Sequence, residues 1–134
     1  MNALPHFRIE LPTLLDIPKR EVLMILAARS WCLLRRSRMD PLPRIAEYLN
    51  SQIAAMRFAV LMDALQQVWP EPFTVHRPCC QAASADELLL CRIIGLANAQ
   101  QRPAFDALLR EMLGSEARDL IYARAQTLNR DVLA

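Results

Sequence analysis

Apolar residues recur at steps of three and four positions along most of the chain, the spacing of α-helices that bury one face. In the first such run, Asp16 can cap a helix and Pro18 suits its first turn, so the pattern predicts a helix over about 17–36. From Leu42 to Val68 the same stepping continues almost without a miss, after an Asp40-Pro41 start signal. This second run predicts one long helix over about 42–69.

The second half of the chain shows clearer start signals. Ser84-Ala-Asp-Glu87 precedes three leucines and has the form of a capping box, which predicts a helix from Ala85 to about Asn98. Arg102-Pro103 opens the next helix, and Gly114 is expected to end it in the left-handed conformation. Ser115 is expected to cap a last helix with a stripe that reaches Val132.

Two segments lack helical periodicity. Residues 1–15 contain prolines and scattered apolar residues, which predicts an extended N-terminal arm ahead of a helical domain at 16–134. Residues 70–78 have proline at both ends and β-favouring residues between them, which predicts a connector with one short strand at most. We therefore expect an all-α, single-domain bundle of about five helices, with this Pro-rich connector between the second and third.

Composition agrees with that fold class and excludes several functions. With 54% hydrophobic residues but only two glycines in 134, the chain has little material for sheet turns or phosphate-cradling loops. The net charge of +2 makes nucleic acid an unlikely partner, and the longest apolar run is too short for a membrane span. No export signal is evident, so we expect a cytoplasmic protein with reduced cysteines.

The segment His76-Arg-Pro-Cys79-Cys80 is the clearest candidate for chemistry. His76 and Cys79 have the spacing of one zinc-ligand pair, but the chain offers no second pair. The two cysteines precede a helix start, where a thiolate is favoured if the loop folds over the helix end. The other interpretation, and the one we favour, is that they are small residues filling space under a loop. Hence no metal or cofactor is expected.

Two further groups are candidates for partner binding. Arg35, Arg36 and Arg38 lie at the end of the first helix, where cations complement the helix dipole and can also contact an acidic partner. The arm carries four apolar residues that could dock on the body or on a partner: Leu4, Phe7, Ile9 and Leu11.

The stretch PCCQAASADELLL, followed by an Arg-Pro and leucine-rich helices, resembles small alphaproteobacterial proteins of a family of unknown function. The likeness rests on Pro78, Cys79, Cys80 and residues 84–90. It implies a bacterial, cytoplasmic, helical protein and transfers no functional residue.

No nucleotide loop, G-x-S-x-G or H-E-x-x-H motif is present. We therefore expect a non-enzymatic protein-interaction, adaptor or regulatory protein that binds a protein partner or forms a homo-oligomer such as a dimer. The alternative is a thiol-based redox sensor or metal-binding regulator that uses His76, Cys79 and Cys80.

Overall fold

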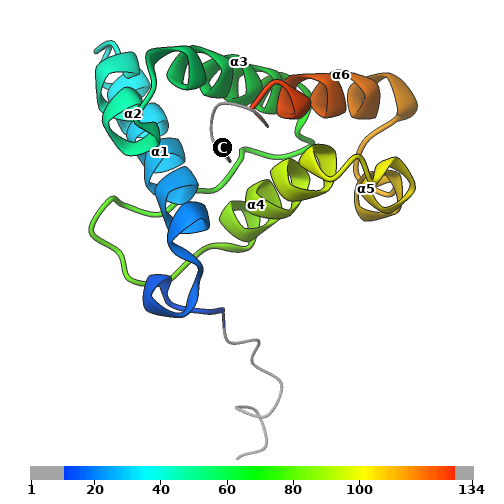
Figure 1. Cartoon of the computed structure of the whole chain (residues 1–134), viewed down its shortest axis with the longest axis horizontal. Helices are drawn as coiled ribbons and strands as arrows, with labels where there is room; N and C mark the ends of the chain where they lie inside the picture. The colour runs from blue at the N-terminus through cyan, green and yellow to red at the C-terminus, as the bar shows by residue number, and fades with distance from the viewer. Residues whose placement is uncertain (1–10, 129–134) are drawn as a thin grey trace, which may run out of the picture.

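The computed structural model describes residues 11–128, which form a helical bundle (Figure 1). Its elements are a short 3-10 helix η2 (Leu14–Asp16) and the helices α1 (Lys19–Arg36), α2 (Leu42–Leu49), α3 (Gln52–Val68), α4 (Ala85–Asn98), α5 (Arg102–Leu109) and α6 (Ser115–Gln126). No strand occurs between Leu11 and Leu128. The expected all-α class is confirmed, with six α-helices in the described part of the chain in place of about five.

The prediction of one long helix over 42–69 is wrong. Asn50 adopts the left-handed conformation, with φ of 56°, and ends α2. Ser51 is extended, and its hydroxyl accepts a hydrogen bond from the backbone amide of Ala54, which starts α3. The apolar spacing runs through the break because α2 and α3 both turn apolar residues toward one core.

The C-terminal helices start and stop differently from the prediction. Gly114 does not take the left-handed conformation but lies extended, with φ of −70°, as the N-cap of α6. Ser115 is therefore the first residue of α6 and not its cap. Helix α5 ends at Leu109, because residues 110–113 continue only as turns. Helix α6 ends at Gln126, and Thr127 and Leu128 form a turn, so the prediction that this helix reaches Val132 is wrong.

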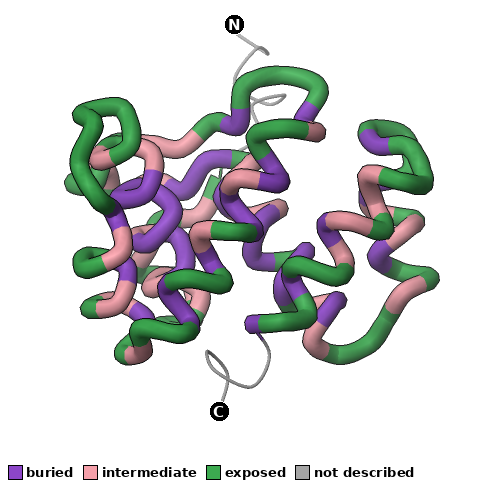
Figure 2. The backbone as a smooth tube through the Cα atoms, turned by 90° about the horizontal axis from the view of Figure 1, so that it is seen from above, coloured by how far each residue is buried: buried purple, intermediate pink, exposed green. Residues whose placement is uncertain are grey.

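Helices α1, α3, α4 and α6 surround the core. Helix α1 packs on α2 and α4, while α6 packs on α3 and α4. The largest apolar side chains of the core come from five helices: Ile25, Trp31, Ile45, Phe58, Leu65, Leu90, Ile94 and Phe105. Figure 2 shows that the buried positions follow the inward sides of the helices, with exposed positions on the outside.

The connector 69–84 has no strand, contrary to the possibility raised by its sequence. Its last part instead pairs with the end of the predicted arm. The amide of Leu14 donates to the carbonyl of Gln81 (2.7 Å), and the amide of Ala83 donates to that of Pro12 (3.1 Å). Residues 12–14 are thus held against the entrance to α4, while Leu4, Phe7 and Ile9 lie outside the described residues.

Candidate functional site

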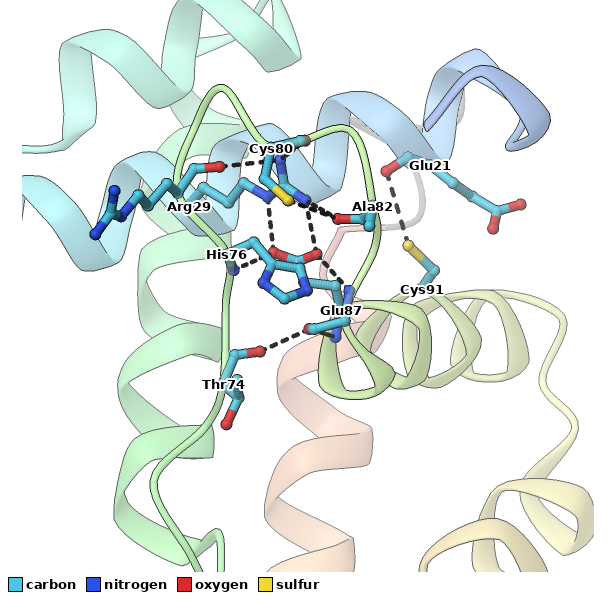
Figure 3. Close-up of polar contacts among 10 residues, drawn as sticks. Glu21, Arg29, Thr74, His76, Cys80, Ala82, Glu87 and Cys91 are labelled. Atoms are coloured by element: carbon cyan, nitrogen blue, oxygen red, sulfur yellow. Dashed lines mark hydrogen bonds and ion pairs between the residues drawn. The ribbon is translucent and has the colours of Figure 1, made fainter. Parts of the chain in front are cut away.

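A fully buried ion pair lies where α1, the connector and α4 meet (Figure 3). Arg29 of α1 and Glu87 of α4 are 58 positions apart in sequence, and both side chains are 0% exposed. The Nε and Nη2 atoms of Arg29 donate to the two Glu87 oxygens at 2.7 and 2.9 Å. This bidentate geometry is the strong form of an arginine–carboxylate contact.

Arg29 also organises the connector. Its Nη1 donates to the carbonyl oxygens of Arg77 (3.2 Å) and Cys80 (2.7 Å), and its Nη2 donates to that of Ala82 (2.9 Å). All five N–H groups of a guanidinium can therefore find an acceptor here. The connector curls around the Arg29 head group, and this is what fixes the backbone of the Cys79-Cys80 segment.

Glu87 is satisfied as completely as Arg29. Its oxygens also accept hydrogen bonds from the backbone amides of His76 and Ser84, each at 2.9 Å. The Ser84 hydroxyl accepts from the Glu87 amide, which completes the predicted capping box, and donates to the carbonyl of Thr74 at 2.7 Å. Glu87 therefore serves both the helix cap and the ion pair.

The electrostatics favour the ionised carboxylate. Burial raises the pKa of Glu87, but the hydrogen bonds from Arg29 and from the amides of Ser84 and His76 outweigh it, so the pKa lies below its ordinary range. An ion pair that is buried and fully hydrogen-bonded holds its elements in one arrangement and costs much to break. We call this group, Arg29 with Glu87, Ser84 and the connector carbonyls, the buried clamp.

The buried clamp occupies the place where the sequence suggested thiol or metal chemistry. Cys79 is exposed and Cys80 is half-buried, with its Sγ 3.6 Å from the Ala82 carbonyl. His76 contributes its backbone amide to the clamp. Within residues 11–128, no three His, Cys, Asp or Glu side chains are placed to hold a metal.

The other two cysteines lie apart from that segment. Burial raises the pKa of Cys32 to about 11 and that of Cys91 to about 12. Cys91 Sγ lies 3.7 Å from the carbonyl of Glu21 on α1. All four cysteines are free thiols, and Cys32 and Cys91 are protonated near neutral pH.

The arginines expected at the end of α1 lie in different surroundings. Arg35 pairs with Asp63 of α3 (3.0 Å) and lies over the Trp31 ring, 4.8 Å from its centroid. Arg36 faces the cleft between α1 and the connector. Arg38 has a positive φ of 59° in the turn that leads to α2. Arg35 and Arg36 thus line the same cleft, whereas Arg38 does not line it.

An apolar surface that the sequence analysis missed lies on α2 and α3. Four large hydrophobic side chains are between 46% and 60% exposed there: Met39, Ile53, Met56 and Val60. Beside them a groove of about 360 Å³ is lined by Leu42, Pro43, Ala46, Ala55 and Met56, with Asp40 and Gln52 at its edge. Together these residues form what we call the α2–α3 surface.

A sequence signal for this surface existed. Ile53, Met56 and Val60 form a second apolar stripe on a helix whose core side already holds Ala54, Phe58 and Leu61. A helix with more apolar positions than one core needs presents some of them outward. The prediction of one buried face per helix does not separate this outward stripe from the core side.

Comparison with protein families, with curated proteins and with solved structures found no match to this chain. The resemblance to an alphaproteobacterial family therefore stays a prediction. Within residues 11–128, no helix is long and apolar enough to cross a membrane. A proposal about function therefore rests on the surfaces and sites of the protein itself.

Proposed function

We propose that this protein is a non-enzymatic interaction protein that binds a partner through the α2–α3 surface. The observation that carries the proposal is the stripe of Ile53, Met56 and Val60 on one side of α3, exposed to solvent, with Met56 also lining an apolar groove. Contiguous exposed apolar surface is the usual mark of an interaction site. The bacterial cytoplasm remains the compartment in which the sequence predicts this activity.

The shape and residue types favour a helix as the occupant. The groove runs beside two helices, and amphipathic partner helices bind such grooves with anchors at steps of three and four residues. Met39 and Met56 are unbranched and polarisable, so they can adapt to the side chains of an inserted helix. The floor is supplied by small residues, Ala46 and Ala55, which allow a close approach.

The groove lining carries little charge. Asp40 is the charged residue that lines it, while Arg44 of α2 pairs with Glu47 and Arg57 donates to the carbonyl of Thr127. We therefore propose an amphipathic helix of another protein that places its apolar face in the groove.

Site-specific photo-cross-linking in the native host tests this proposal. Met56 and Met112 are both exposed methionines, 58% and 37%, on different parts of the molecule, so each can be replaced by benzoylphenylalanine as a matched pair. Cross-links at position 56 that are absent at 112 should map to an amphipathic helix of one partner protein. A synthetic peptide of that helix should bind the protein, and Met56→Glu should weaken binding by a factor of ten or more.

Three results would contradict the proposal. Cross-linking of position 56 to a second copy of this chain would identify the surface as a dimer interface, as the sequence also allowed. Equal cross-linking at 56 and 112 would show that contact is not specific to the α2–α3 surface. A folded Met56→Glu variant that binds the peptide as tightly as the parent would place the binding site elsewhere.

A further inference from the structure

A second cleft, unrelated to the α2–α3 surface, lies between α1 and the connector. It has a volume of about 540 Å³ and is lined on one side by Trp31, Arg35 and Arg36 and on the other by Phe73 and Val75. A smaller hollow of about 80 Å³ shares Arg36 and Val75 with it and adds Arg77. The larger cleft has the size of sites that bind small molecules.

The charges that line this cleft are positive and partly uncompensated. Neither Arg36 nor Arg77 has an ion pair with a carboxylate within residues 11–128, and no Asp or Glu lines either hollow. Arg35 is different, since it pairs with Asp63. Arg36 lines both hollows and Arg77 lines the smaller one, and arginines beside a cleft without a carboxylate make a site that favours an anion.

Trp31 adds an independent observation. Its side chain is 2% exposed, and its indole Nε1 has no hydrogen-bond acceptor within the described residues. A buried N–H that lacks an acceptor is rare and destabilising, and a functional role or a bound water or ion is among its recognised explanations. Trp31 lines the cleft itself, so an acceptor bound there is a candidate partner for this indole N–H.

We propose that this cleft binds a small organic oxyanion, a carboxylate or phosphate monoester attached to an apolar body. The oxyanion would be held by Arg36, which lines both hollows, and by Arg77 from the smaller hollow, and Trp31 Nε1 would donate to one of its oxygens. Phe73 and Val75 supply the apolar wall for the body of the ligand. This function is separate from partner binding, because the cleft and the α2–α3 groove share no lining residue.

The test uses the full chain and three probes of similar size: phenyl phosphate, benzoate and the neutral benzyl alcohol. The indole N–H signal of Trp31 is followed by NMR, with Trp69→Phe used to assign it, and affinities come from calorimetry. We expect saturable binding of at least one anion and a shift of the Trp31 signal. Benzyl alcohol should bind at least tenfold more weakly. Binding of phenyl phosphate alone would identify a phosphate site, and of benzoate alone a carboxylate site.

Charge-matched variants complete the test. Arg36→Gln and Arg77→Gln should each weaken anion binding about tenfold or more, since a charged hydrogen bond is lost. Arg124→Gln removes the same charge from an exposed position on α6 and should leave affinity unchanged. Absence of saturable binding by either anion would overturn the proposal. So would equal loss in the Arg124 and Arg36 variants, which would show only general attraction by a cationic protein.

Discussion

Two arginine–carboxylate groups in this molecule use the same chemistry in opposite environments. The buried clamp joins Arg29 to Glu87 across 58 residues, with both side chains at 0% exposure. The other, which we call the surface network, links Arg102 and Arg118 to Asp106, and Arg102 also to Asp119, near the start of α5 and α6. Its members range from 15% to 68% exposed.

The two groups differ in the cost of removing one partner, because the remaining partner is buried in one group and reaches water in the other. Loss of one partner in the buried clamp leaves a charge and several backbone polar groups buried without a hydrogen-bond partner or water. In the surface network, water and salt replace a lost partner at little cost. Burial raises the pKa of Asp106, but the hydrogen bonds and charges of Arg102 and Arg118 together outweigh it and lower that pKa; this shift signals an interaction without signalling large stability. The hydrogen-bond distances alone would predict equal contributions to stability, and it is burial that separates the two groups.

The largest expected effect is that of removing one member of the buried clamp. Arg29→Met or Glu87→Gln should lower the free energy of unfolding by about 3–5 kcal/mol, because each leaves a buried charge or carboxylate unpaired. Urea unfolding followed by circular dichroism measures this. Glu111→Gln, at an exposed glutamate of the same type, is the control and should change little.

The next largest effect is the pH dependence of the stability that Glu87 contributes. The folded-state pKa of Glu87 lies below its unfolded value of about 4.3, so its contribution is fully present above that pH. The contribution is lost as the pH falls through the folded-state pKa. The stability difference between the parent and Glu87→Gln should therefore be constant from pH 7 to 5 and shrink below about 4. A difference that does not change on acidification would refute the assignment.

The two serine caps provide a smaller and matched comparison. Ser84 accepts from the Glu87 amide and donates to the Thr74 carbonyl, whereas Ser51 makes the single cap bond to Ala54. Ser84→Ala should cost about 2 kcal/mol and Ser51→Ala about 1 kcal/mol in thermal unfolding. Equal losses would show that the Thr74 bond adds nothing to the cap.

The smallest effect is expected in the surface network. Arg102→Gln should lower the melting temperature only slightly, and the loss should disappear at high salt because exposed charges are screened. The destabilisation by Arg29→Met should persist at the same salt concentration. Scanning calorimetry at low and high sodium chloride compares the two. A salt-sensitive Arg29→Met effect would mean that water reaches the buried clamp.

Local sequence signals are enough to predict most of the helices of this protein. The Ser84–Glu87 capping box predicts the observed start of α4 at Ala85, because the motif satisfies amides within one turn of the chain. The break between α2 and α3 was missed, although Asn50-Ser51 combines a residue that tolerates the left-handed conformation with a good helix cap. Apolar spacing alone does not register such a break.

The buried clamp could not be predicted from local pattern. Glu87 was interpreted as a cap residue, and nothing near it in sequence points to a partner 58 residues away. The available hint was Arg29, a charge within the apolar run VLMILAARSWCLL. An arginine on the core side of a helix needs a buried acceptor, but which carboxylate supplies it depends on the tertiary fold. For the same reason the sequence of the His76–Cys80 segment suggests side-chain chemistry, whereas in the structure its backbone amide and carbonyls contact Glu87 and Arg29.

A double-mutant cycle on Arg29 and Glu87 tests the central claim, that these side chains act as one unit holding α1, the connector and α4 together. Unfolding free energies are measured for the parent, Arg29→Met, Glu87→Leu and the double variant. Since either single change already breaks the pair, we predict that the double variant loses less than the sum of the singles by at least about 2 kcal/mol. Additive losses would contradict the claim, because they would mean that the two side chains stabilise the protein independently.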